Sequence, residues 1–157
     1  MKICVIGAGT MGAGIAQVFA TAGHAVTLCD VSLPLAQKGR DTIEKGLNRL
    51  VSKGKLSQED CEKTLAAVTP GMMDSAAGCD LVLEAVKEDE AVKTTLFANL
   101  AALCGENTLF ATNTSSLSVT ALSAAAGRPV VGMHFFNPAP VMALVEVVAG
   151  LTTPPEQ

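Results

Sequence analysis

The sequence predicts an α/β fold in which helices cover both faces of a mostly parallel sheet. Short apolar runs rich in β-branched residues alternate with longer segments of helical periodicity along the chain. Nearly continuous apolar strands separated by helices are typical of a parallel sheet that is buried on both faces. A glycine-rich turn, residues 7–12, joins the first apolar run to the first helical segment. The length of 157 residues fits one domain of this kind.

The expected strands are apolar and rich in β-branched residues: Lys2–Ile6, Ala25–Asp30, Leu81–Glu84, Thr108–Thr112, Val130–Phe135 and Leu144–Ala149. The expected helices share a helical spacing of apolar residues: Met11–Ala22, Leu33–Ser52, Gln58–Ala67, Glu90–Leu103 and Ser118–Ala124. A short strand at Ala67–Thr69 is a further candidate. The two helices after the second strand form a helical arm, and we expect the final strand to run antiparallel.

Two of the expected helices have a clear division of residue types. In Leu33–Ser52, basic and apolar residues fall on opposite faces. The basic face holds Lys38, Lys45, Arg49 and Lys53, and the apolar face holds Ile43, Leu47, Leu50 and Val51. In Glu90–Leu103, apolar residues recur at helical spacing, namely Val92, Leu96, Leu100 and Leu103. Acidic residues 88–90 gather at its start, where the helix dipole favours anions.

The composition is that of an ordered globular domain, and it excludes several classes of function. The formal net charge of −4 leaves no sequence-wide basic surface for nucleic acid. No apolar run approaches the ~20 residues that a membrane span needs, and the apolar run Ile3–Ile6 is too short for a signal peptide. The five cysteines are odd in number and widely spaced. We therefore expect neither a metal site nor a disulfide framework, and we expect a cytoplasmic location.

The glycine-rich turn has the features of a dinucleotide-binding site. Gly7-Ala8-Gly9-Thr10-Met11-Gly12 follows a strand directly and opens a helix, whose N-terminus would present N–H groups to phosphates. Gly7 permits the tight turn, Gly9 the approach of the pyrophosphate, and Gly12 close packing of helix on strand. Asp30 ends the second strand, where a carboxylate binds the adenosine ribose and repels a 2′-phosphate, so NAD is favoured over NADP. The alternative is a turn that binds nothing, with Asp30 as a strand terminator.

The two histidines have different surroundings. His24 lies in a predicted surface turn, where we expect a structural role, whereas His134 ends a strand. If the chain folds back antiparallel about Pro140, His134 faces Glu146 in the final strand. A carboxylate in a valine-rich strand is costly to bury unless it is paired, and its charge would orient an imidazole and favour the imidazolium. The pair predicts a general acid–base. The alternative is that the two side chains only satisfy each other's hydrogen bonds.

Three motifs stand out along the chain: Gly7–Gln17, Asn113–Leu117, and His134–Pro138 followed by Leu144–Glu146. Together they resemble the 3-hydroxyacyl-CoA dehydrogenases, and within that family they are most similar to the bacterial 3-hydroxybutyryl-CoA dehydrogenases. The resemblance spans essentially the whole chain. It implies a Rossmann-type domain, NAD as the cofactor and an acyl-CoA substrate. The implied reaction is hydride transfer between NAD(H) and a short-chain 3-hydroxyacyl-CoA/3-ketoacyl-CoA pair, such as 3-hydroxybutyryl-CoA and acetoacetyl-CoA.

The resemblance also implies a role for each matching position. His134 would be the catalytic base and Glu146 its orienting partner. Ser115 would hydrogen-bond the 3-oxygen of the substrate close to the nicotinamide, although spacing alone favours a cap for the following helix. Asp30 would hold the adenosine ribose, and Asn137 would approach the nicotinamide end. The full set of implied cofactor contacts is Gly7, Gly9, Thr10, Met11, Gly12, Asp30, Glu88, Lys93, Ser115 and Asn137.

The sequence departs from the family in two respects. Ala143 stands where the family usually has lysine, which weakens any claim of a charge there. The family also continues into an all-helical domain that supplies a further catalytic asparagine, part of the acyl-CoA cleft and the dimer contact. We therefore expect residues 1–150 to form the NAD-binding domain and residues 151–157 to be a linker to a missing C-terminal helical domain. The full-length protein would be a homodimer through that domain.

A basic helical arm is the candidate contact for the phosphates of CoA. Seven of the eleven Lys and Arg residues lie between Lys38 and Lys63. Our hypothesis is that Lys53 and Lys55, at the tip of the arm, bind the nucleotide end of CoA. The alternative is a solvated face that binds nothing.

Two other functions stay open at this point. The chain could be an NAD-binding sensor or structural module without turnover, which would have no need of His134 beside Glu146. A related β-hydroxyacid or sugar dehydrogenase is the other alternative, and the His134–Pro138 segment argues against it.

Overall fold

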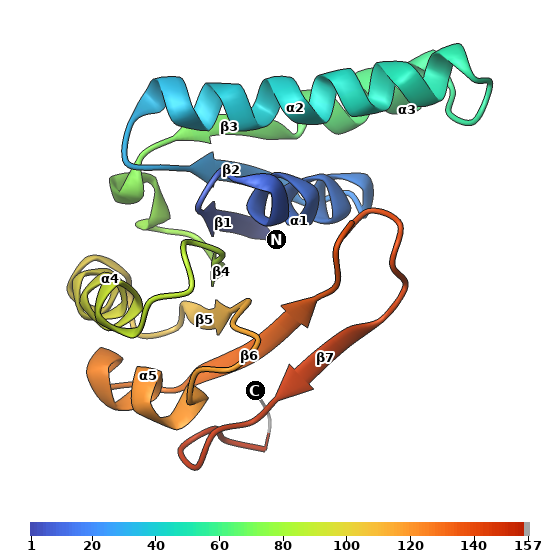
Figure 1. Ribbon diagram of the computed structural model, residues 1–157. Helices are drawn as coiled ribbons and strands as arrows, with labels where there is room; N and C mark the ends of the chain where they lie inside the picture. Colours follow the sequence, from blue (N-terminus) through green and yellow to red (C-terminus); the bar gives the residue numbers. More distant parts are fainter. Residues whose placement is uncertain (156–157) are drawn as a thin grey trace.

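A sheet of seven strands organises residues 1–155, the part of the chain that the computed structural model describes (Figure 1). The strands are β1 (Lys2–Ile6), β2 (Ala25–Cys29), β3 (Val68–Gly71), β4 (Leu81–Glu84), β5 (Leu109–Thr112), β6 (Val130–Phe135) and β7 (Val145–Val148). The helices are α1 (Thr10–Thr21), α2 (Leu33–Ser52), α3 (Gln58–Ala66), α4 (Glu90–Leu103), α5 (Val119–Ala126) and the short 3-10 helix η1 (Met73–Ala76). The predicted α/β fold is confirmed.

The order of the strands creates a binding crevice at the carboxyl ends of the parallel strands. The order is β3-β2-β1-β4-β5-β6-β7, with β1 to β6 parallel and β7 antiparallel to β6, as predicted. β1 pairs with β2 on one side and with β4 on the other, so the winding direction reverses there. Ligands of open parallel sheets bind outside the carboxyl ends of the strands at such a reversal. The glycine-rich turn begins at that end of β1.

Two boundaries on the β2 side differ from the expectation. The candidate strand at Ala67–Thr69 is β3, which extends to Gly71 and pairs with β2. β2 ends at Cys29, so Asp30 lies just beyond the strand rather than inside it. The carboxylate is therefore free of the constraints of the ladder and can turn toward the glycine-rich turn.

The start of α5 corrects one interpretation of the sequence. Ser118 is the N-cap of α5, and its Oγ accepts a hydrogen bond from the N–H of Ala121 at 3.2 Å. The idea that Ser115 caps this helix is therefore wrong, because the cap lies three residues further along. Ser115 belongs instead to an exposed loop between β5 and α5.

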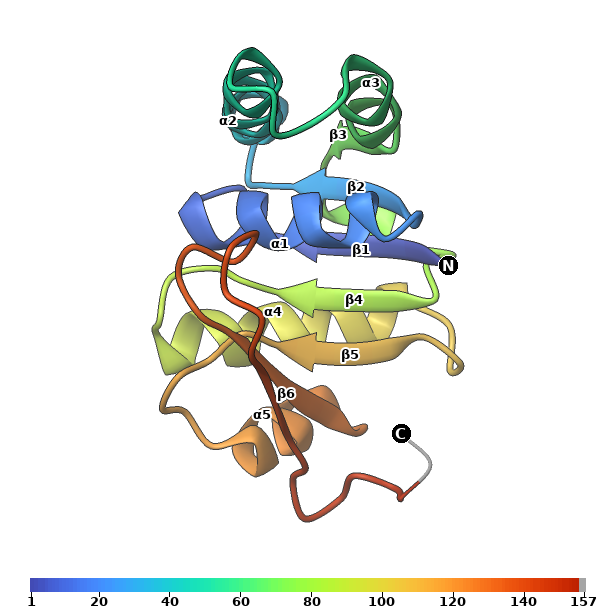
Figure 2. The same cartoon turned by 90° about the vertical axis from the view of Figure 1, so that its right-hand side faces the viewer.

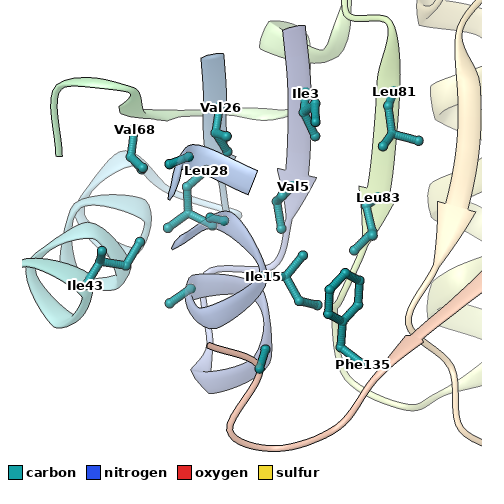
Figure 3. Close-up of a cluster of buried hydrophobic side chains, with 14 of the residues drawn as sticks. Ile3, Val5, Ile15, Val26, Leu28, Ile43, Val68, Leu81, Leu83 and Phe135 are labelled. Carbon is teal, nitrogen blue, oxygen red and sulfur yellow. The ribbon is translucent and has the colours of Figure 1, made fainter. Parts of the chain in front are cut away.

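The core is divided between the two faces of the sheet because side chains alternate along each strand. Ile3 and Val5 of β1 pack on the side of α1, and Figure 3 shows Ile15 of α1 inside this cluster. Cys4 and Ile6 face the opposite side, where the core includes residues of α4 and α5. Figure 2 shows α1 in front of the sheet with α4 and α5 behind it. Both faces are thus covered, as the apolar strands predict.

α4 buries a different face from the one that its apolar spacing suggests. Its buried residues are Lys93, Phe97 and Leu100, whereas Val92 is 46% exposed. The shift brings Lys93 into contact with the carboxylates of Glu84, which is buried, and Glu88. Val92 and Leu96 face the pocket at the carboxyl edge of the sheet.

The helical arm consists of α2 and α3, packed side by side (Figure 1). Of the predicted apolar face of α2, Ile43 and Leu47 are each 2% exposed and thus buried, whereas Leu50 is 36% exposed. The loop between α2 and α3 extends to the same side of the molecule as the turn between β6 and β7. Over residues 1–155, no helix combines the length and the apolar character needed to cross a membrane. Of the predicted linker 151–157, residues 156–157 lie outside the described part.

Candidate active site

Neighbouring strand ends hold the glycine-rich turn in place. Gly7 has a φ of +104°, and its N–H donates to the carbonyl oxygen of Cys29 at 2.8 Å. A Cβ at Gly7 would lie 2.6 Å from the carbonyl oxygen of Ala85, and one at Gly12 would lie 1.6 Å from the carbonyl oxygen of Gly7. Glycine at both positions therefore lets α1 approach the ends of β1 and β4 closely.

Gly9 has open space above it, since a Cβ there would meet no protein atom within 4 Å. Gly9 is the N-cap of α1 and supplies no side-chain acceptor. The first-turn N–H groups, including those of Thr10 and Met11, are the ones that a helix leaves without an intrahelical partner. Open space beside a helix N-terminus is the arrangement that accepts a pyrophosphate. The turn therefore fits a dinucleotide.

A pocket of about 490 Å³ opens next to this turn. Its lining residues come from the strand ends and from α4 and η1, and they are Ile6, Gly7, Gly9, Asp30, Val31, Met73, Ala85, Val86, Lys87, Val92 and Leu96. Asp30 accepts hydrogen bonds from the N–H groups of Ala8 at 2.8 Å and Val31 at 2.7 Å, which fix its carboxylate. Aliphatic walls with one fixed carboxylate suit an adenosine, whose ribose hydroxyls donate to that carboxylate.

β6 and β7 place His134 opposite Glu146, so the predicted fold-back about Pro140 is confirmed. His134 Nδ1 lies 2.8 Å from Glu146 Oε2. An ionised carboxylate is only an acceptor, so Nδ1 carries the proton and Nε2 of the neutral ring keeps its lone pair. The basic nitrogen of His134 is therefore Nε2.

One premise behind this pairing is wrong. The Glu146 side chain is 53% exposed, and that of His134 is 18% exposed. Burial of the carboxylate therefore does not force the contact. The antiparallel register of β6 and β7 brings the two side chains together, because directly opposite residues of such a pair lie next to each other.

Ser115 completes a chain of three side chains at this edge of the sheet. Its Oγ lies 3.1 Å from His134 Nε2, so the hydroxyl can donate to the free lone pair. We call Ser115, His134 and Glu146 the acid–base triad. Since β1, β5 and β6 are parallel, their carboxyl ends meet at one edge, and the triad shares that edge with the glycine-rich turn.

An ion-pair network around the buried Lys93 supports the Ser115 loop from the side of α4. Lys93 is 1% exposed, and its Nζ lies 2.6 Å from Glu88 and 3.1 Å from Glu84. Glu88 in turn accepts hydrogen bonds from the hydroxyl of Thr114 and, at 3.0 Å, from the N–H of Ser115. The backbone position of Ser115 thus depends on a carboxylate that Lys93 holds.

The charge on Glu88 is strongly favoured. Partial burial raises the pKa of Glu88, but hydrogen bonds from Lys93 and Thr114, together with the Lys93 charge and the Ser115 N–H, lower it further. The net result is a pKa of about 2. Glu88 is therefore an ionised acceptor at neutral pH.

Sequence reasoning missed Glu84 and Thr112. Glu84 is fully buried and accepts hydrogen bonds from Thr112 Oγ1 at 2.6 Å and from the N–H of Val86 at 2.7 Å. The available signal was a carboxylate at the end of the apolar strand Leu81–Glu84, because such a group cannot be buried without a partner. That partner is Lys93, which the sequence linked only to the cofactor.

Among the described residues, the remaining predicted site residues form no hydrogen bond or ion pair with the triad. Asn137 is exposed in the turn after β6, and Lys53 and Lys55 are exposed in the loop between α2 and α3. His24 Nδ1 lies 3.5 Å from the N-terminal amine. In the described chain, no group of three or more His, Cys, Asp or Glu residues is placed to hold a metal ion.

The reversal of winding between β1 and β4, the glycine-rich turn and Asp30 together define a Rossmann-type dinucleotide-binding domain. Residues 2–157 match the family model described as 3-hydroxyacyl-CoA dehydrogenase, NAD binding domain. The chain therefore belongs to the 3-hydroxyacyl-CoA dehydrogenase family, and it is the NAD-binding domain of that family. The family and the cofactor predicted from the motifs are both confirmed.

Individual relatives show how much of the family the chain covers. The 3-hydroxyadipyl-CoA dehydrogenase of Escherichia coli (strain K12) is 51% identical over 157 residues, which are 98% of this chain and 33% of the relative. The 3-hydroxybutyryl-CoA dehydrogenase of Clostridioides difficile is 44% identical, over 98% of this chain and 56% of the relative. The crystal structure of (S)-3-hydroxybutyryl-CoA dehydrogenase from Ralstonia eutropha superposes with a TM-score of 0.95 at 41% identity, over 99% of this chain and 56% of that one. The chain spans about half or less of the length of these relatives.

Proposed function

We propose that this domain is the NAD-binding half of a dehydrogenase that interconverts 3-hydroxyacyl-CoA and 3-ketoacyl-CoA. The observation that carries the proposal is the continuous hydrogen-bonded chain from Ser115 Oγ through His134 to Glu146. These three hydrogen-bonded side chains lie at the carboxyl ends of the parallel strands, as does the glycine-rich turn that fits NAD. A proton acceptor beside a hydride acceptor is what oxidation of a secondary alcohol requires.

The geometry supports a defined path for the proton. Bound NAD would supply the acceptor for the hydrogen that leaves carbon 3 of the substrate as hydride. His134 Nε2 accepts the hydroxyl proton, and Glu146 stabilises the imidazolium that forms. Ser115 Oγ releases Nε2 and donates instead to the substrate oxygen, where charge develops. In the reductive direction, the imidazolium returns the proton to that oxygen.

The other predicted contacts support the cofactor side of the same site. Asp30 binds the adenosine ribose, and Asn137 lies next to the nicotinamide end. Glu88 and Lys93 lie beside the cofactor, where Glu88 fixes the loop that carries Ser115. Lys93 acts through Glu88, since its own side chain is buried.

Acyl transfer by the triad is a second candidate, because a hydroxyl, an imidazole and a carboxylate in this order also form the triad of serine hydrolases. Acyl transfer needs free N–H groups to bind an oxyanion. Here the N–H of Ser115 donates to Glu88 at 3.0 Å, and the N–H of Ser116 donates to Thr114 Oγ1 at 3.4 Å. Both amides next to the nucleophile position are thus occupied, which supports dehydrogenation.

The substrate is proposed to be a short-chain acyl-CoA, and two relatives suggest alternatives for its tail. Their names refer to 3-hydroxybutyryl-CoA, with a methyl end, and to 3-hydroxyadipyl-CoA, with a carboxylate end. We propose that residues 1–150 bind NAD and hold the triad. A helical domain reached through residues 151–157 would complete the acyl-CoA cleft and form a homodimer in the cytoplasm.

NADH oxidation tests the proposed reaction. The complete protein should oxidise NADH with acetoacetyl-CoA or 3-oxoadipyl-CoA, and the ratio of kcat/KM for the two would identify the tail. His134→Gln should lose general acid–base catalysis, about 10²- to 10⁴-fold in kcat, with NADH affinity retained. NADH binding without turnover of either substrate would instead favour a sensor or structural module. Residues 1–157 alone should bind NADH but turn over poorly.

A further inference from the structure

The parallel pairing between β5 and β6 ends before the positions of Ser115 and His134. β5 and β6 pair from Phe110↔Val130 to Thr112↔Gly132. Ser115 lies beyond the end of β5, and His134 lies beyond Gly132, the last residue of β6 that pairs with β5. The parallel ladder therefore does not fix the distance between Ser115 Oγ and His134 Nε2.

Asn113 bridges this gap with its backbone and its side chain. Its N–H donates to the carbonyl oxygen of Glu84 at 2.8 Å, which continues the contact between β4 and β5. Its Oδ1 accepts a hydrogen bond from the N–H of Phe135 at 2.8 Å, one residue after His134. A backbone N–H can only donate, so this contact fixes the amide with Oδ1 toward β6. One side chain thus replaces the missing ladder bond.

We propose that Asn113 is a positioning residue that sets the distance between Ser115 and His134. The inference rests on the proposed function, and it extends that function to a residue that forms no hydrogen bond with the triad among the described residues and does not line the pocket beside the glycine-rich turn. Asn113 precedes Ser115 by two residues, and its acceptor holds the residue next to His134. Loss of the acceptor would let the end of β6 move relative to the Ser115 loop.

The opposite side of the Ser115 loop is already fixed, so the contact to β6 decides the geometry. Glu88 accepts from the N–H of Ser115 at 3.0 Å and from the hydroxyl of Thr114, and Lys93 anchors Glu88. These contacts tie the loop to α4, not to β6. His134 is tied to β7 through the antiparallel register and through Glu146. Between these two units, the Asn113–Phe135 bond is the link next to the triad.

A carboxamide suits this task for physical reasons. Neighbouring strands lie ~4.8 Å apart, so a backbone donor on one strand needs an acceptor that reaches across. Asn provides such an oxygen, which accepts from the N–H of Phe135. Asn113→Leu has a similar size and lacks the acceptor, and Asn113→Asp keeps the acceptor.

The experiment compares these variants in the complete protein, with Asn99→Leu on the exposed face of α4 as the matched control. Asn113→Leu should lower kcat about 100-fold, the effect of a misplacement near 1 Å, while the NADH dissociation constant changes little. Asn113→Asp should recover most of the lost rate, and Asn99→Leu should leave it unchanged. In a Ser115→Ala background, Asn113→Leu should have a much smaller effect than alone, because both changes break the same contact.

Two results would overturn the inference. Equal fold-losses in both backgrounds would show that Asn113 does not act through Ser115. A parallel loss of rate, NADH affinity and melting temperature, without recovery in Asn113→Asp, would show that Asn113 only supports the fold.

A readout independent of turnover separates this inference from the proposed function. In ¹⁵N spectra of the histidine ring, the Nε2 signal of His134 should report the loss of the Ser115 hydrogen bond in Asn113→Leu and its retention in Asn113→Asp. If the wild-type protein reduces no 3-ketoacyl-CoA, the proposed function fails and these spectra still decide the role of Asn113. An unchanged Nε2 signal in Asn113→Leu would refute the positioning role.

Discussion

Gly14 of α1 lies against Ala139 in the turn between β6 and β7. A Cβ at Gly14 would lie 3.2 Å from the Cβ of Ala139 and 3.2 Å from the Cδ of Pro140. α1 starts at the glycine-rich turn, and the turn between β6 and β7 joins the strands that carry His134 and Glu146. The cofactor helix therefore touches the turn that joins the two triad strands, at a point where a side chain is absent.

This contact predicts different effects for two substitutions at Gly14. Gly14→Ala requires a shift of only a few tenths of an ångström, and the gain in helix propensity, about 1 kcal/mol, offsets that strain. Gly14→Val adds two further carbons, pushes the turn away and displaces His134, so kcat should fall about 10- to 100-fold. Steady-state kinetics and thermal melting of both variants check this. Equal activity of the two would mean that the turn yields without moving the triad.

The glycines of the dinucleotide turn should separate binding from folding. Gly9→Ala places its Cβ in open space, so the melting temperature should stay near the wild-type value while NADH affinity falls. Gly12→Ala places its Cβ 1.6 Å from the Gly7 carbonyl oxygen, so the fold should lose about 1–3 kcal/mol or more. Melting curves and NADH titration of the two variants measure both effects. Retained NADH affinity in Gly9→Ala would contradict the role of Gly9 in pyrophosphate binding.

Local patterns predicted most of the fold. α2 and α4 begin and end where their periodicity indicates, and the register of β6 and β7 follows from the position of Pro140. η1 was missed because a single 3-10 turn has no periodicity to detect. The predicted buried face of α4 also differs from the observed one, because the apolar pattern gave no reason to expect that Lys93 is buried.

In the candidate site, too, local patterns predicted some of the contacts and missed others. His134 and Glu146 belong to neighbouring strands joined by one turn, so their meeting could be deduced from an antiparallel fold-back about Pro140. Glu84 and Asn113 act through contacts between β4, β5, β6 and α4 that are distant in sequence. Such contacts depend on strand order, which no local pattern encodes.

Glu88 should make stability depend on pH in the acid range. The pKa of Glu88 falls from 4.5 to about 2 on folding. The charged form therefore stabilises the fold fully at pH values above 4.5, the pKa of the unfolded state. This stabilisation is lost as the pH falls from about 4.5 toward about 2. Glu88→Gln should therefore be less stable than wild type at pH 6, and the difference should shrink toward pH 2. Urea unfolding between pH 6 and pH 2.5 measures it, and a difference that is constant with pH would contradict the assignment.

Asp30 should control the choice of cofactor. Asp30→Asn keeps an acceptor for the N–H of Ala8 or Val31 and removes the charge. A hydrogen bond to a charged group contributes about 1.5–3 kcal/mol, so NADH affinity should fall about 10- to 100-fold. NADPH should lose its electrostatic penalty, and the preference for NADH should narrow. Titration of both nucleotides measures the ratio of dissociation constants, and an unchanged ratio would refute the role of Asp30 in selectivity.

Lys53 and Lys55 at the tip of the helical arm test the proposed route of CoA. Both side chains are exposed, and the loop that holds them extends to the side of the turn between β6 and β7. If they bind CoA phosphates, Lys53→Glu with Lys55→Glu should raise KM for acetoacetyl-CoA about tenfold at low salt. KM for a truncated thioester without the nucleotide should stay unchanged. Lys38→Glu, near the start of α2, is the matched charge control. Equal changes for both substrates would show that the arm has only a general electrostatic effect.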